Sequence, residues 1–194
     1  WLSEGFATYF AHLYEEQFSG RDAFVRGLKD DVNALITEQQ KNPDQPVIHH
    51  NITDMRRVLN AFVYLKAGWV LHMLRGVMGT EKFWLGIREY YRRYRDLNAS
   101  TDDFRQVMEQ ASGRDLTWFF DQWLKRPGMP RLAATWRYNP AAKAIEVDIR
   151  QTQPGTPYRL PVEIGMTPPG GGQPVVQAVE LTSAQGHFKV AIDV

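Results

Sequence analysis

Hydrophobic residues follow two different patterns along the chain, and the change falls near residue 127. Before it, apolar side chains recur at spacings of three and four, which predicts amphipathic helices. After it, they alternate and are interrupted by proline and glycine, which is typical of short strands joined by turns. The pattern therefore predicts an α+β protein of two modules, a helical one over residues 1–127 and a β-rich one over residues 128–194.

Six helices are expected in the first module, with their ends marked by glycine, proline and short polar residues. Gly79 is expected to end the third helix in a left-handed conformation, Thr80 to cap the fourth, and Ser100 to cap the fifth. The fourth helix is expected to pack through its aromatic residues, Tyr91 included. The helices are predicted at about 1–19, from 22 to the proline-containing stretch 42–46, at 58–78, from 80, from 101 to 113 and from 115.

Five strands are expected in the second module, at residues 131–138, 144–151, 159–166, 175–181 and 187–192. Strands of this length with turn signals between them indicate a small antiparallel β-sandwich. Five strands are few for a sandwich, so a truncated C-terminal end is part of this expectation. The aromatic residues Trp136, Tyr138, Tyr158 and Phe188 are expected to lie in its core.

Composition excludes several classes of function. The 23 basic and 22 acidic side chains give a net charge near +1, so we expect neither nucleic acid nor an anionic membrane as a partner. No apolar run approaches the roughly 20 residues that span a bilayer, so the chain is expected to be soluble and without a transmembrane segment. The absence of cysteine excludes disulfides and thiolate metal sites. It fits the cytoplasm as well as a periplasmic or secreted location, and the compartment stays open.

The chain begins with Trp1, without an initiator methionine or a targeting segment. It is therefore expected to be a piece of a larger protein, and its chemistry that of a fragment.

Glu4 is the first candidate for chemistry. Most glutamates in the first turn of a helix only complement the helix dipole, and that interpretation applies to an isolated carboxylate. Here, however, Glu4 lies in the segment Trp-Leu-Ser-Glu-Gly-Phe-Ala-Thr-Tyr-Phe, residues 1–10.

Tyr64 is the second candidate. A tyrosine in an apolar helix usually packs in the core with its hydroxyl hydrogen-bonded. Its setting is Phe-Val-Tyr-Leu-Lys-Ala-Gly over residues 62–68, sixty residues after Glu4.

Both segments resemble those of aminopeptidase N-type zinc metallopeptidases, the gluzincin family with an HExxH motif followed by a glutamate. The first segment resembles the one that carries the third zinc ligand, and the second resembles the Y-x-K-G segment of the family. One departure is that Ala67 stands where the family has the glycine after the lysine, with Gly68 one place later. The resemblance continues in order through residues 79–83, 101–104, 115–124 and 127–132, so it covers essentially the whole chain.

The resemblance implies that residues 1–127 are the mainly helical second half of a thermolysin-like catalytic domain, followed by the β-sandwich. It implies a zinc-dependent aminopeptidase that binds one zinc ion and acts on peptides with a free N-terminus. Glu4 would be a metal ligand, and Tyr64 a catalytic donor to the oxyanion.

The histidine pair of HExxH is absent, since no two of the five histidines have its spacing. The missing N-terminal part of the catalytic domain would be a partner of this chain. The isolated chain is expected to lack zinc and to be inactive.

Two alternatives from another class stay open. The chain could belong to a non-catalytic relative whose helices and sandwich form a scaffold or a protein-binding module. It could also be a sugar- or partner-binding β-sandwich with a helical adaptor, which would require a solvent-exposed aromatic platform. An HExxH motif at the right distance upstream of Trp1 would favour the enzyme.

Overall fold

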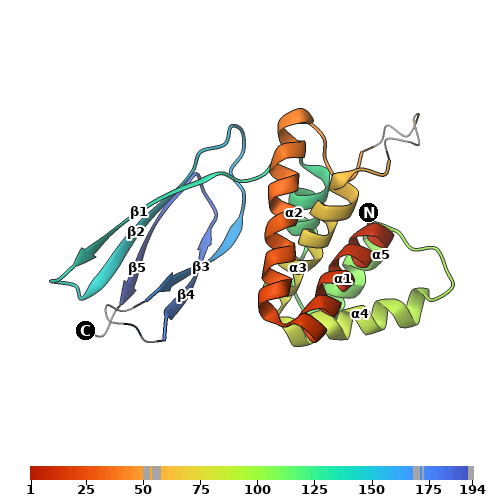
Figure 1. Cartoon of the computed structure of the whole chain (residues 1–194), viewed down its shortest axis with the longest axis horizontal. Helices are drawn as coiled ribbons and strands as arrows, with labels where there is room; N and C mark the ends of the chain where they lie inside the picture. Colours follow the sequence, from red (N-terminus) through yellow and green to blue (C-terminus); the bar gives the residue numbers. More distant parts are fainter. Residues whose placement is uncertain (50–52, 54–57, 168–170, 172, 192–194) are drawn as a thin grey trace. The chain divides into compact units, whose positions relative to one another are not determined.

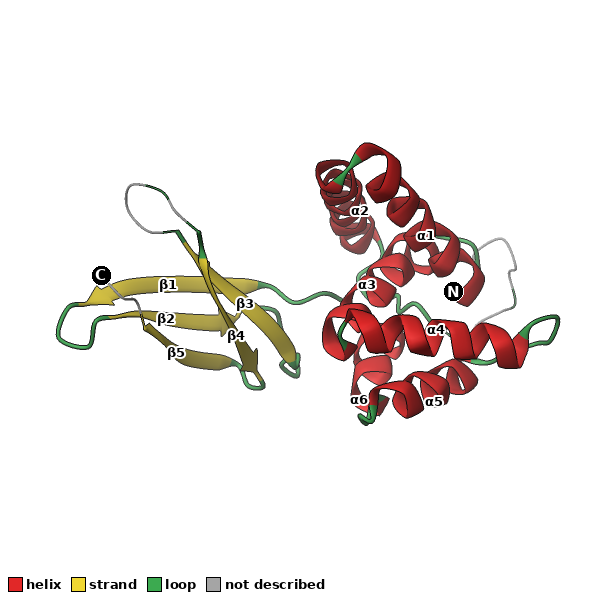
Figure 2. Cartoon of the chain, turned by 90° about the horizontal axis from the view of Figure 1, so that it is seen from below, coloured by secondary structure: helices red, strands yellow, loops and turns green. Residues whose placement is uncertain are grey.

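The computed structural model describes residues 1–49, 53, 58–167, 171 and 173–191. It divides into two compact units, a helical one of residues Trp1–Gly128 and a β-rich one of residues Met129–Val194 (Figure 1). Helices and strands do not mix between the two parts of the chain (Figure 2). The α+β fold class predicted from the hydrophobic pattern is confirmed.

The described residues of the helical unit contain the elements that the spacing of apolar residues predicts, together with two short π-helical segments. Its core is formed by large side chains from most of these helices, among them Phe24, Phe83, Phe104 and Phe119. In chain order the elements are α1 (Leu2–Ser19), α2 (Arg21–Lys41), η2 (Phe62–Lys66), α3 (Ala67–Met78), α4 (Thr80–Tyr94), α5 (Thr101–Ser112), α6 (Thr117–Phe120) and η3 (Asp121–Lys125).

The third predicted helix differs most from its expected form. It begins at residue 61 rather than 58, and its first turns are the π-helix η2 before regular α-helix starts at Ala67. Asn60 explains this start, because its side-chain oxygen accepts a hydrogen bond from the backbone N–H of Phe62 at 2.9 Å.

The predictions for helix ends were correct at Ser100 and wrong at Thr80. Ser100 and Asp103 form a reciprocal capping box at the start of α5. Thr80 is instead the first residue inside α4, which has no side-chain cap. Gly79 does end α3 with a positive φ of 84°, but its ψ of 146° lies outside the left-handed helical region. The packing role expected for Tyr91 is also wrong, because this residue is 65% exposed.

In the β-rich unit, the residues that the structure describes form five strands in two antiparallel sheets. One sheet has the order β1-β2-β5 and the other pairs β3 with β4. Val147, Ile149, Leu160, Leu181 and Val190 from both sheets are buried. The strands are β1 (Leu132–Asn139), β2 (Ala144–Gln151), β3 (Leu160–Met166), β4 (Val175–Leu181) and β5 (Gln185–Ala191).

The expectation that the aromatic residues of this unit lie in its core is only partly correct. Tyr158 is buried, whereas Trp136 is 72% exposed and Tyr138 is 46% exposed. Both exposed residues are on β1, which is an edge strand and pairs only with β2. An edge strand has one lateral neighbour, so fewer side chains are available to cover it.

Candidate functional site

Glu4 lies in the first turn of α1, and the start of this helix is held by aromatic packing. The ring of Trp1 packs edge-on against Phe104 and Phe120, with centroid distances of 6.2 and 6.5 Å. The indole N–H of Trp1 donates a hydrogen bond to the Thr101 hydroxyl at 2.9 Å. The helix that carries Glu4 is therefore fixed at its first residue to the segment around α5.

Gly5, next to Glu4, allows α1 to approach α3 closely. A Cβ added at Gly5 would lie 2.7 Å from the Cβ of Ala67 and 3.1 Å from its carbonyl carbon. Only glycine is compatible with this distance unless the neighbouring helix shifts. Ala67, which stands where the family has a glycine, is thus the residue that contacts Gly5. Its methyl group fills the space next to this glycine.

Tyr64 is in the middle of η2, immediately before the crossing with α1. In this segment the backbone N–H of Ala67 bonds to the carbonyl of Phe62, five residues earlier. Single π-helical turns of this kind are rare in proteins, but those that occur often lie at functional sites.

The two candidate residues meet in the structure although sixty residues separate them in the sequence. The pKa of the Tyr64 phenol is raised above its usual value of 10, first by desolvation, then by the charge of Glu4 and by a hydrogen bond to the Glu4 carboxylate. A phenol with a pKa of 10 or above is protonated at neutral pH, so the Tyr64 hydroxyl can donate a hydrogen bond there.

The Glu4 carboxylate fits one position of a zinc site. Carboxylate oxygens are among the usual ligands of zinc. Among the residues that the structure describes, no basic side chain forms an ion pair with Glu4, and no group of three or more His, Asp or Glu could hold a metal ion. One carboxylate supplies a single ligand of the three that catalytic zinc sites commonly take from the protein.

Three of the histidines have protein partners away from Glu4. The His12 ring pairs with Asp31 on α2 at 2.7 Å, and His72 lies 3.3 Å from the Tyr9 hydroxyl. His187 pairs with Asp148 in the β-rich unit. His50 is outside the described residues.

Sequence reasoning missed the role of Lys66 in the surroundings of this site. Lys66 ends η2, is only 3% exposed, and donates a hydrogen bond from Nζ to the carbonyl of Gly128 at 3.1 Å. A signal was present in the sequence, because Lys66 lies four residues from both Phe62 and Val70, which are buried. The helical period therefore places this lysine on the apolar stripe.

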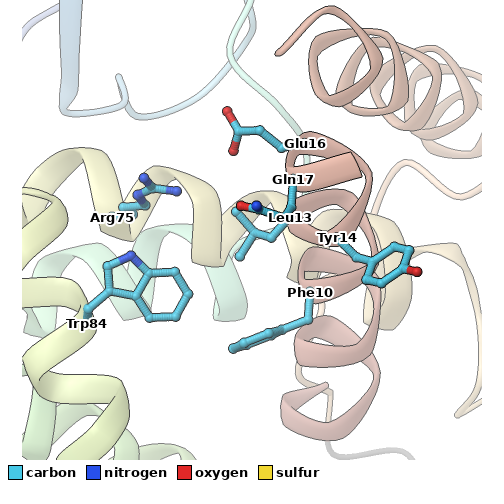
Figure 3. A pocket seen from close by; sticks show the side chains of 7 residues that line it. All are labelled: Phe10, Leu13, Tyr14, Glu16, Gln17, Arg75 and Trp84. Atoms are coloured by element: carbon cyan, nitrogen blue, oxygen red, sulfur yellow. The ribbon is translucent and has the colours of Figure 1, made fainter. Parts of the chain in front are cut away.

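The helical unit also has an open pocket that does not include Glu4 or Tyr64. Its lining comes from the second half of α1, with one residue each from α3 and α4 (Figure 3). The rings of Phe10 and Trp84 meet edge-on across it, with centroids 5.9 Å apart. The lining residues are Phe10, Leu13, Tyr14, Glu16, Gln17, Arg75 and Trp84.

Comparison with known proteins identifies the family. The model of the peptidase family M1 domain matches residues 1–123. The chain therefore belongs to the peptidase family M1.

Several relatives of the chain are aminopeptidases. The chain is 32% identical to aminopeptidase N of Escherichia coli strain K12 over 162 residues, covering 74% of this chain and 18% of that protein. It is 31% identical to aminopeptidase M1-C of Oryza sativa subsp. japonica over 133 residues, covering 67% of this chain and 15% of that protein. The chain thus spans less than a fifth of the length of these two relatives.

A solved structure shares the fold. Legionella pneumophila aminopeptidase A, solved in complex with aspartic acid, superimposes with a TM-score of 0.76 at 21% sequence identity. The match covers 98% of this chain and 21% of that chain. Among the described residues of the present chain, no helix is both long and apolar enough to cross a membrane.

Proposed function

We propose that this chain carries part of the active site of a zinc-dependent aminopeptidase, with Glu4 as one zinc ligand and Tyr64 as the donor to the oxyanion. The observation that supports the proposal most directly is the packing of η2, which carries Tyr64, against α1, which carries Glu4, close enough for the charge of Glu4 to raise the pKa of the Tyr64 phenol. The membership of the family M1 and the aminopeptidases among its relatives agree with it. The remaining ligands, a histidine pair from an HExxH helix, would come from outside this chain.

A bound zinc ion would polarise the scissile carbonyl of the peptide and lower the pKa of a water molecule. The contribution of this chain is to hold the metal with the Glu4 carboxylate and to place the Tyr64 hydroxyl beside the substrate. When water adds to the carbonyl, negative charge develops on the carbonyl oxygen. Tyr64, protonated at neutral pH, donates a hydrogen bond to that oxygen and stabilises the transition state.

Substitutions in the full-length protein that contains this chain test the two roles separately. We expect Tyr64→Phe to lower kcat by about a hundredfold or more while zinc content is retained, because it removes one donor to the oxyanion. Glu4→Ala is expected to lose the zinc, which elemental analysis of the purified protein measures. The substrate is an aminoacyl anilide, for which release of the aniline is followed by absorbance.

Tyr94→Phe is the matched control, since it removes a tyrosine hydroxyl that donates to a carboxylate, that of Asp103 at 3.1 Å, in the α4–α5 pair. Its kcat is expected to stay near that of the wild type. The oxyanion role is wrong if Tyr64→Phe leaves turnover within about twofold.

A second candidate function is favoured by one observation. Trp136 and Tyr138 are exposed on the edge strand β1, as an aromatic platform for a partner would require. In that case the chain belongs to a non-catalytic member of the family that binds another protein. The sequence upstream of Trp1 discriminates, because only the enzyme needs HExxH there.

A further inference from the structure

Lys66 is an unusual residue to find inside the helical unit. Among the described residues, those that are polar or charged and also buried are Lys66, Ser112 and Glu146. Glu146 is paired with Arg137 at 2.6 Å. For Lys66 the structure records a hydrogen bond to one neutral group, the backbone carbonyl of Gly128.

Burial of this lysine costs stability. Desolvation, and then the nearby charge of Arg126, lower the pKa of the Lys66 ammonium group from 10.5 to about 8. At neutral pH the group is still charged, and within the described part of the chain no anionic side chain pairs with it; a buried charge of this kind is unfavourable. A methionine of similar length would fill the same space without this cost, so packing alone does not account for a lysine here.

The position of Lys66 relative to Tyr64 suggests what the residue does. The two side chains are two positions apart in η2, and such residues do not share a helix face. Tyr64 lies close enough to Glu4 of α1 for its charge to raise the Tyr64 pKa, whereas Lys66 Nζ donates a hydrogen bond to the carbonyl of Gly128, the last residue of the helical unit. The π-helical turn that carries both residues therefore lies next to α1 on the side of Tyr64 and is bonded to Gly128 on the side of Lys66.

A π-helical turn needs such attachments. Its hydrogen bonds reach five residues back, a pattern that occurs mostly as single turns within α-helices and not as extended helix. Asn60 fixes the first residues of η2, and the contact of Ala67 with Gly5 fixes the residue after it. Lys66 adds the third attachment, to Gly128, whose φ of +85° favours glycine at the position that presents the carbonyl.

We propose that Lys66 is a positioning residue: its ammonium group, held by the Gly128 carbonyl, fixes the π-helical turn so that the Tyr64 hydroxyl stays directed at Glu4 and at the substrate oxyanion. This inference rests on the proposed function for its consequence in catalysis. Its structural part, the dependence of the Tyr64 position on Lys66, stands without it.

The first test measures kcat and KM for Lys66→Met in the full-length protein. We expect kcat to fall by about tenfold or more, with KM within about threefold and zinc content unchanged, because a transition-state contact is lost while substrate binding is kept. Lys82→Met is the matched control, since Lys82 Nζ also donates to a backbone carbonyl, that of Ser112 at 2.9 Å, away from Tyr64. Its kcat is expected to stay within about twofold of the wild type.

A double substitution asks whether Lys66 acts through Tyr64. When Lys66→Met is added to Tyr64→Phe, the further loss of kcat is expected to be less than about threefold, because the hydroxyl to be positioned is already absent. If the two losses multiply, or if Lys66→Met alone keeps kcat within about twofold, the proposal is wrong. Lys66→Gln, which is too short to reach Gly128, has the same expected loss and replaces the methionine variant if that one does not fold.

A crystal structure of Lys66→Met separates failure of this inference from failure of the proposed function. The Tyr64 hydroxyl is expected to be displaced from the place beside Glu4 that it holds in a crystal structure of the wild type, which is a readout independent of activity. A Tyr64 that keeps its place in that structure overturns the positioning role, even if turnover is lost. A protein without aminopeptidase activity whose Tyr64 moves on substitution would refute the proposed function and leave the positioning role intact.

Discussion

At the scale of single residues, the candidate site contains two groups whose pKa values are shifted by their surroundings. Desolvation and Glu4 raise the pKa of Tyr64, and its hydroxyl is protonated at neutral pH. Burial and Arg126 lower the pKa of Lys66 to about 8. The chemistry of both residues thus follows from neighbours that are distant in sequence.

The lowered pKa of Lys66 predicts a pH dependence of stability. Between pH 8 and 10.5 the unfolded chain binds more protons at this residue than the folded chain, so the contribution of Lys66 to the free energy of unfolding rises with pH in that window. A pKa difference of this size corresponds to about 3 kcal/mol. Urea unfolding of the wild type and of Lys66→Met at pH 7 to 10.5, followed by the helical circular dichroism signal, measures it.

The wild type is expected to gain up to this amount relative to Lys66→Met as the pH rises through the window. Lys82→Met, at an exposed position, should change in parallel with the wild type. Equal pH profiles for the wild type and Lys66→Met would show that the folded and unfolded pKa values of Lys66 are the same.

At the scale of elements, the crossing of α1 with η2 and α3 determines the geometry of the site. Gly5 and Ala67 are in contact there, and Gly68 faces Thr8 one turn further along α1. A Cβ added at Gly68 would lie 3.0 Å from the Thr8 methyl carbon. Small residues on both helices therefore allow the close approach that brings Glu4 and Tyr64 together.

This contact predicts the effect of adding one methyl group. Gly5→Ala would place its Cβ 2.7 Å from the Ala67 Cβ, and the helices would have to separate. We expect the free energy of unfolding to fall by about 1–3 kcal/mol, the usual range for overpacking. Adding Ala67→Gly should restore part of the loss, because the Ala67 backbone carbon at 3.1 Å still limits the space.

Urea unfolding of the single and double variants measures both effects. Gly76→Ala is the control, since a Cβ there would meet nothing within 4 Å and the position is helical. A Gly5→Ala protein as stable as the wild type would contradict the close packing of these helices.

At the scale of the whole molecule, the chain combines a helical unit with a smaller β-rich unit and spans less than a fifth of two aminopeptidase relatives. Among the described residues, no group of three or more His, Asp or Glu could hold a metal ion.

We expect the 194-residue chain alone neither to bind zinc tightly nor to hydrolyse aminoacyl anilides, because one carboxylate cannot replace a three-ligand site. Equilibrium dialysis against zinc and an anilide assay on the purified chain measure this. Stoichiometric zinc together with turnover would contradict the assignment of Glu4 as one ligand among three.

The sequence by itself determined the order and approximate bounds of the elements, the α+β class and the two residues that the family resemblance singles out. Helical and strand periods, caps such as Ser100 and turn-forming glycines are local features, so they can be read without knowing the fold. Because these signals are local, both predicted ends of each of the five strands lie within two residues of the observed ends.

Only the tertiary structure decided which of these residues are buried and what they contact. The burial of Lys66, the exposure of Trp136 and the contact of Gly5 with Ala67 depend on segments far away in the chain. The π-turn at Tyr64 depends on attachments on several sides at once, and no periodic pattern encodes it. Local patterns predict elements, whereas the geometry of a site arises from the way in which those elements pack.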